Sequence, residues 1–165
     1  MLSGSTTVLM VLLSLLSSAP PDPEAMRKEL VAELAASFAA RLDDSETYAR
    51  TVARECRGFP EGDLFPHLFP LHAFAGMAHE GLMEMERARE LSSALLALAI
   101  PVVAGRVNAP NGDLSKLKSY RKQATYICQL NVALGRYRLL GGHDHDAVHD
   151  HLTLLIRNAL AHAQG

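Results

Sequence analysis

Apolar residues recur at helical spacing along almost the whole chain. Between residues 23 and 42 they return every fourth position, which predicts an amphipathic helix that begins after Asp22 as N-cap and ends near Leu42. Further helices are expected over about 45–56, 70–85, 87–104, 115–140 and 146–163. No stretch alternates apolar and polar residues for long, as a half-buried strand would. The sequence therefore predicts an all-α fold with about six helices in successive antiparallel hairpins.

The first nineteen residues form a different kind of segment. They contain no Asp, Glu, Lys or Arg, and the apolar run at 8–16 is followed by Ser17-Ser18-Ala19. A short apolar run before small residues is typical of a secretory signal peptide, although a first core helix is the alternative interpretation. The run is shorter than the ~20 apolar residues that cross a bilayer, so no permanent membrane span is expected. We predict a signal peptide over 1–19, one all-helical domain over 20–165, and a protein exported to the periplasm or the cell exterior.

Composition and charge narrow the classes of partner. The chain has 165 residues, 48% of them hydrophobic, which is enough for the core of a single domain. Its 16 basic and 18 acidic residues nearly balance, which argues against a global nucleic-acid binder. The basic residues at 116–122 could contact phosphates, but no aromatic residues that stack on bases are interleaved with them. Nucleic acid is therefore not an expected partner.

The chain has two cysteines, Cys56 and Cys128, which fall in different predicted helices. Two cysteines are too few for a disulfide framework or a four-thiolate zinc site. Export would place both thiols in an oxidising environment, where they could pair. A Cys56–Cys128 disulfide and two isolated thiols are the two alternatives.

Histidines and aspartates crowd residues 143–151, HDHDAVHDH. Only His145 and His149 stand four residues apart on the predicted last helix, about 6 Å along its axis, so only this pair suits a shared metal ion. The alternative is a polar helix start, where carboxylates favour the positive end of the helix dipole. We expect no other cofactor.

The long helix expected over 115–140 carries polar residues on its inner face. A helical wheel places Tyr120, Gln123 and Asn131 in the same sector as its apolar residues. Buried amides need hydrogen-bond partners, which a neighbouring helix, water or a ligand can supply. These three residues are the candidate wall of a ligand pocket, with polar links between helices as the alternative. No nucleophile elbow, phosphate loop or dinucleotide fingerprint occurs, so the sequence identifies no catalytic residue.

Three stretches carry a resemblance to a known group of proteins. They are LFPHLFP at 64–70, GDL at 112–114 with SY at 119–120 and ATYICQLNVALG at 124–135, and GG at 141–142 with AVHDHL at 147–152. Together they resemble the N-terminal part of uncharacterised bacterial exported proteins that look related to helical toroid, or (α/α)-barrel, proteins. That group includes carbohydrate-active enzymes, but the resemblance transfers no catalytic residue. It implies an architecture like half of a toroid.

About six helices are half of the twelve that such a ring needs. An open half-ring would expose a large apolar face, so we expect either self-association or a missing C-terminal half. The leading hypothesis is an exported structural or binding unit without a complete active site. The alternatives are the front half of a carbohydrate-active or related toroid enzyme, and a periplasmic metal-binding helical module.

Overall fold

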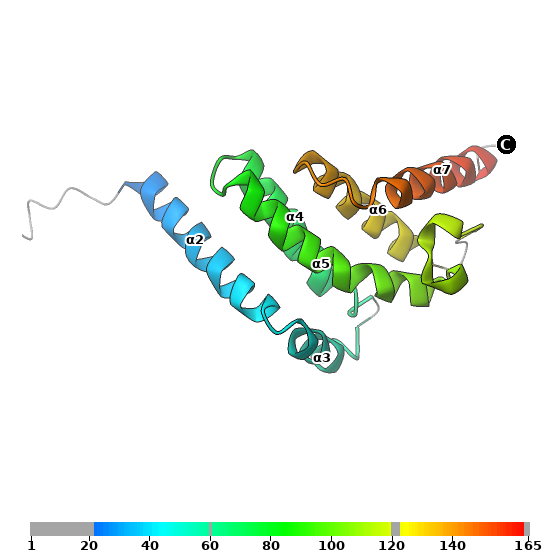
Figure 1. Cartoon of the computed structure of the whole chain (residues 1–165), viewed down its shortest axis with the longest axis horizontal. Helices are drawn as coiled ribbons and strands as arrows, with labels where there is room; N and C mark the ends of the chain where they lie inside the picture. Colours follow the sequence, from blue (N-terminus) through cyan, green and yellow to red (C-terminus); the bar gives the residue numbers. More distant parts are fainter. Residues whose placement is uncertain (1–21, 60, 120–122, 164–165) are drawn as a thin grey trace, which may run out of the picture.

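The structure is a computed structural model that describes residues 22–59, 61–119 and 123–163 (Figure 1). Every regular element in these ranges is a helix, and none of them is a strand, which confirms the predicted all-α class. Two short 3-10 helices, η1 and η2, precede α6. The elements in chain order are α2 (Pro23–Leu42), α3 (Ser45–Glu55), α4 (Phe65–His79), α5 (Met85–Arg106), η1 (Pro110–Gly112), η2 (Leu114–Lys116), α6 (Ala124–Leu139) and α7 (Asp146–Ala163).

Helices α4, α5, α6 and α7 form the body of the molecule. Helices α4, α5 and α6 pack on one another, and α7 packs on α6 and on η2. The largest fully buried side chains are mainly leucines from these elements, such as Leu68, Leu95 and Leu130. Leu114 and Leu117, in the segment before α6, also enter this core. The core therefore sits mainly among the body helices, and Ala35 of α2 reaches its edge.

Helix α5 is long and apolar enough to cross a membrane by length and composition. Its buried residues, which include Ala88, Leu95 and Val103, instead contact the other body helices. A helix that is apolar on most sides is expected at the centre of a helical core, and α5 lies there.

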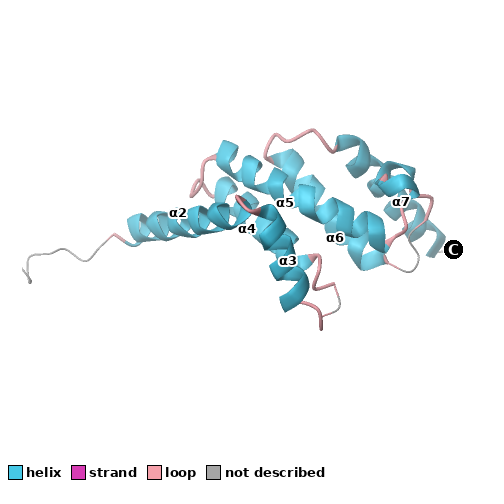
Figure 2. Ribbon diagram, turned by 60° about the horizontal axis from the view of Figure 1, so that its bottom comes forward, coloured by secondary structure: helices cyan, strands magenta, loops and turns pink. Residues whose placement is uncertain are grey.

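Helices α2 and α3 lie at the edge of the body, and α2 contacts α3 at the turn between them (Figures 1 and 2). Of their 31 residues only Val31, Ala35 and Val52 are buried. The sequence predicted an amphipathic α2. Only part of its apolar face is buried, because Met26, Leu30 and Leu34 are each more than half exposed.

Two predicted helix starts are wrong. Helix α4 begins at Phe65, five residues earlier than expected, because Pro66 suits the first turn of a helix. Helix α6 begins at Ala124 rather than near Ser115. There Asp113 Oδ1 accepts hydrogen bonds from the backbone N–H and the hydroxyl of Ser115, which caps the start of η2, and the chain turns extended at Leu117.

A turn at residues 80–84 separates α4 from α5, where the sequence left open whether the helix expected over 70–85 and the one expected over 87–104 are separated by a break. Gly81 there has a φ of +70°, and the N–H of Leu82 donates to the carbonyl of Met77. A residue in the left-handed region just after a helix is a common way to end it, and glycine adopts it without a steric penalty. This turn brings α5 back alongside α4.

Candidate functional site

The polar side chains singled out on α6 and α7 meet each other between these two helices. Asn131 Nδ2 donates to Thr153 Oγ1 at 3.0 Å, and Asn131 Oδ1 lies 2.9 Å from His149 Nδ1. The His149 ring lies over Gly135, where an added Cβ would come within 3.3 Å of Cε1. A side chain at position 135 would crowd the ring. We call these side chains, Asn131, His149 and Thr153, the α6–α7 polar link.

His145 does not share the surroundings of His149. Its ring lies 5.9 Å from that of Tyr137, centroid to centroid, at a tilt of 42°. His143 Nδ1 is 3.0 Å from Asp146, which also pairs with Arg138. Within the described residues no three His, Cys, Asp or Glu side chains are grouped so that they could hold a metal ion. The metal site at His145 and His149 stays a prediction that this geometry does not support.

Of the three residues of the candidate pocket, Gln123 and Asn131 lie in the described part of the chain. Gln123 is the N-cap residue of α6, half-buried, and its side chain makes no capping hydrogen bond. Asn131 lies two turns further along, in the α6–α7 polar link. Tyr120 lies outside the described residues. For Asn131 the structure therefore shows the alternative that the sequence left open, a hydrogen bond to a neighbouring helix.

Both cysteines are free thiols in the structure. Cys56 follows the last residue of α3, whereas Cys128 lies on α6 in the body, and each is half-buried. No disulfide therefore ties α3 to the body here.

A second polar cluster, which the sequence did not reveal, ties the loop before α4 to α5 and α6. Asp63 Oδ2 accepts from Arg106 Nε at 2.8 Å, and Asp63 Oδ1 accepts from the Tyr126 hydroxyl at 2.8 Å. The guanidinium of Arg106 also lies 5.8 Å above the Tyr126 ring centroid, within cation–π range. We call these three residues the Asp63 cluster. Because its members are far apart in sequence, no local pattern indicates it.

The electrostatics of the Asp63 cluster follow from its hydrogen bonds. Burial alone would raise the pKa of Asp63, but the Tyr126 and Arg106 hydrogen bonds outweigh it and lower that pKa. Burial, and then the hydrogen bond to Asp63, raise the pKa of Tyr126 to about 12. The hydroxyl therefore keeps its proton and donates to a carboxylate over the whole physiological pH range. The cluster is a stable link rather than a source of reactive protons.

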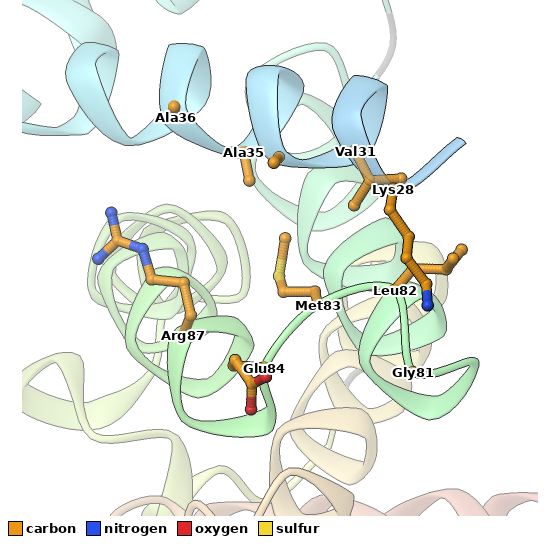
Figure 3. Close-up of a pocket in the computed structure, with 10 residues that line it drawn as sticks. Lys28, Val31, Ala35, Ala36, Gly81, Leu82, Met83, Glu84 and Arg87 are labelled. Carbon is orange, nitrogen blue, oxygen red and sulfur yellow. The ribbon is translucent and has the colours of Figure 1, made fainter. Parts of the chain in front are cut away.

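Two hollows of the described residues lie beside α2. One groove, about 520 Å³, runs between α2 and the turn that joins α4 to α5 (Figure 3). Met83 points from that turn toward α2, where Val31 and Ala35 line the opposite wall, and Lys28 and Arg87 lie nearer the rim. Its floor is apolar, which suits the packing of side chains more than the binding of a polar ligand or catalysis.

A second groove, about 690 Å³, lies in the angle between α2 and α3. Phe38, Tyr48, Val52 and Cys56 are among its lining residues. None of the sequence-predicted pocket or metal residues lines either groove.

In comparisons with known proteins, no family model, curated protein or solved structure matches the chain. The resemblance to helical toroid proteins therefore stays a prediction.

Proposed function

We propose that the chain is an exported structural or binding unit that acts through its helical framework and holds no complete active site of its own. The observation that carries this proposal is the α6–α7 polar link, in which Asn131 and His149 bind each other. These were the strongest candidates for ligand and metal binding, and each is already engaged between helices. The Asp63 cluster supports the same conclusion, because its carboxylate is held by two partners from the body.

A double-mutant cycle on Asn131 and His149 tests whether the link is structural. We expect Asn131→Ala and His149→Ala each to lower the free energy of unfolding, because each leaves a half-buried polar partner unpaired. The two losses should not add, with a coupling energy of about 0.5–1.5 kcal/mol as expected for one hydrogen bond. Urea denaturation of the four proteins gives this value. Additive losses would mean that the two side chains do not stabilise each other.

Zinc titration separates this proposal from the metal-binding alternative. Calorimetry of the wild-type chain and of a His145→Ala/His149→Ala variant should give the same weak or negligible binding. Tight binding that the double variant loses would replace the structural proposal with a metal-binding one. His79→Ala, which removes an exposed histidine on α4, is the matched control.

Export is part of the proposal and rests on the pattern of residues 1–19, which lie outside the described residues. Fusion of residues 1–30 to a reporter that is active only outside the cytoplasm tests it. Replacing Leu12 and Leu13 by Arg should abolish the reporter signal, because it interrupts the apolar run.

Sedimentation of the chain over a range of concentrations tests the expected self-association, and a concentration-independent monomer would exclude it.

A further inference from the structure

A chain of aromatic rings holds α2 and α3 against the body. The Phe74 ring of α4 meets that of Phe38 on α2 edge-on, at 5.6 Å between centroids, and Phe38 meets Tyr48 of α3 at 5.9 Å. Tyr48 in turn meets the ring of His67, back on α4, at 5.5 Å. Edge-to-face ring pairs at these distances are favourable. We call these four residues the aromatic clasp, because they alternate between the body and the two N-terminal helices.

A hydrogen bond from Tyr48 of α3 to α4 also joins the two helices, and Pro70 leaves its acceptor free. Pro70 lies inside α4 and has no N–H, so the carbonyl of Pro66, four residues earlier, lacks its usual helical donor. The Tyr48 hydroxyl donates to that carbonyl at 2.7 Å. Burial raises the pKa of Tyr48 to about 12, so this donor keeps its proton at neutral and acid pH. The bond does not titrate in that range.

His67 is the titratable member of the clasp. Its side chain is 3% exposed, and its Nδ1 has no hydrogen-bond partner among the described residues. It lies in the first turn of α4, where the helix dipole disfavours a positive charge. Burial lowers the pKa of His67, and the neighbouring Asp63 offsets this only in part. At neutral pH the clasp therefore closes around an uncharged imidazole.

The charged and titratable surroundings of His67 contain little that could compensate a positive charge. Tyr48 faces the ring from α3 and stays neutral, while Asp63 lies one turn before it and is already bound by Arg106 and Tyr126. Around Tyr48 itself the charged and titratable neighbours are Arg41 of α2 and Cys56. A protonated His67 would thus be hydrated on leaving the clasp, and it would give up few favourable electrostatic contacts.

We propose that α2 and α3 form an arm that detaches from the body in mildly acidic solution, and that protonation of His67 releases it. The arm has little else to hold it. Its buried contacts are few, and the Arg27–Glu80 ion pair that links α2 to the α4–α5 turn is more than half exposed on both sides. Exposed ion pairs of this kind stabilise weakly.

The direction of the pH effect follows from proton linkage. Detachment removes part of the burial that lowers the pKa of His67, so its pKa rises toward the ordinary value of about 6.5, whereas the attached state binds the proton only at lower pH. Attachment is therefore strongest above about pH 6.5 and weakens as the pH falls below it. Release would expose Phe38, Ala35 and Val31 of α2, and Phe74 of α4, as one apolar surface.

Hydrogen exchange measured by mass spectrometry at about pH 7.5 and about pH 5 tests this proposal, with labelling times scaled for the intrinsic rate of exchange. In acid, the amides of α2 and α3 should lose protection, because protonation of His67 favours the detached arm. A detached helix pair is only marginally stable by itself. Amides of α5 and α6 should keep their protection. Equal loss in all helices, or no loss in the arm, would overturn the proposal.

Substitutions at His67 test whether this residue causes the loss of protection in acid. His67→Phe keeps a ring in the clasp but cannot take up a proton, so its arm should be equally protected at both pH values. His67→Gln provides a second variant that does not titrate. His72→Gln is the matched control, since His72 also lies on α4 and has a lowered pKa, but its charged neighbour is Arg136 of α6. An acid response that persists in both His67 variants, or that disappears in the control, would contradict the proposal.

Discussion

At the scale of single residues, the α6–α7 polar link and the Asp63 cluster both join partners that are distant in sequence. Asp63 bonds to residues 43 and 63 positions away, and Asn131 bonds to residues on the next helix. Of the apolar residues that the wheel of the predicted long helix places inside, Ile127, Leu130 and Leu134 are buried, whereas Ala124 is exposed. The wheel could not identify the hydrogen-bond partners of the polar residues, because a wheel holds no information about the neighbouring helix.

The hydroxyl of Tyr126 gives a prediction at this scale. Tyr126→Phe should lower the free energy of unfolding by about 1–2 kcal/mol near neutral pH, since a partly buried carboxylate loses a donor. The pKa of Asp63 is lowered in the folded state, so its contribution is present above the unfolded pKa of about 3.9 and is lost as the pH falls through the folded value. Urea denaturation at about pH 7 and about pH 3 should therefore show a deficit that shrinks in acid. Arg50→Ala, which breaks an exposed ion pair with Glu46, is the control and should change stability little.

At the scale of elements, the helix ends that the sequence located correctly are those with local signals. Asp22 accepts a hydrogen bond from the N–H of Glu24 and begins α2, as predicted. Gly141-Gly142 ends α6, also as predicted. The start of α6 was missed because it depends on Leu114 and Leu117 entering the core and on His151 contacting the Leu117 carbonyl. Those contacts come from tertiary packing, which overrides local helix propensity.

The glycines that end α6 give a prediction at the element scale. Gly141 has a φ of +82°, and a Cβ at Gly142 would come within 2.2 Å of the buried Tyr137 ring. Gly141→Ala and Gly142→Ala should each lower the free energy of unfolding by about 1–3 kcal/mol, from backbone strain and from steric overlap respectively. Gly105→Ala, within α5 and with no atom near its added Cβ, should instead raise it by about 0.5–1 kcal/mol. Thermal or urea unfolding compares the three, and a stabilising substitution at either 141 or 142 would contradict this account.

At the scale of the whole molecule, the chain divides into a body with a core and two N-terminal helices with little burial. The apolar face of α2 indicated the correct helix but not which part of that face is buried. The smaller Val31 and Ala35 face the body because they let α2 approach the α4–α5 turn near Met83. Periodicity alone could not make this choice, since α2 is apolar over a face wider than the one that it buries.

Substitutions on the two faces of α2 test this division. Leu30→Lys/Leu34→Lys replaces half-exposed side chains whose stems can stay on the helix, so the free energy of unfolding should change by less than about 0.5 kcal/mol. Val31→Lys/Ala35→Lys places the same charges toward the body and should increase amide exchange of α2 while that of α5 stays unchanged. Leu95→Ala, in the body core, should cost about 2–5 kcal/mol and increase exchange in every helix. Three distinct responses would mean that the arm and the body differ in stability because they differ in burial, whereas one shared response would mean that they unfold as a single unit.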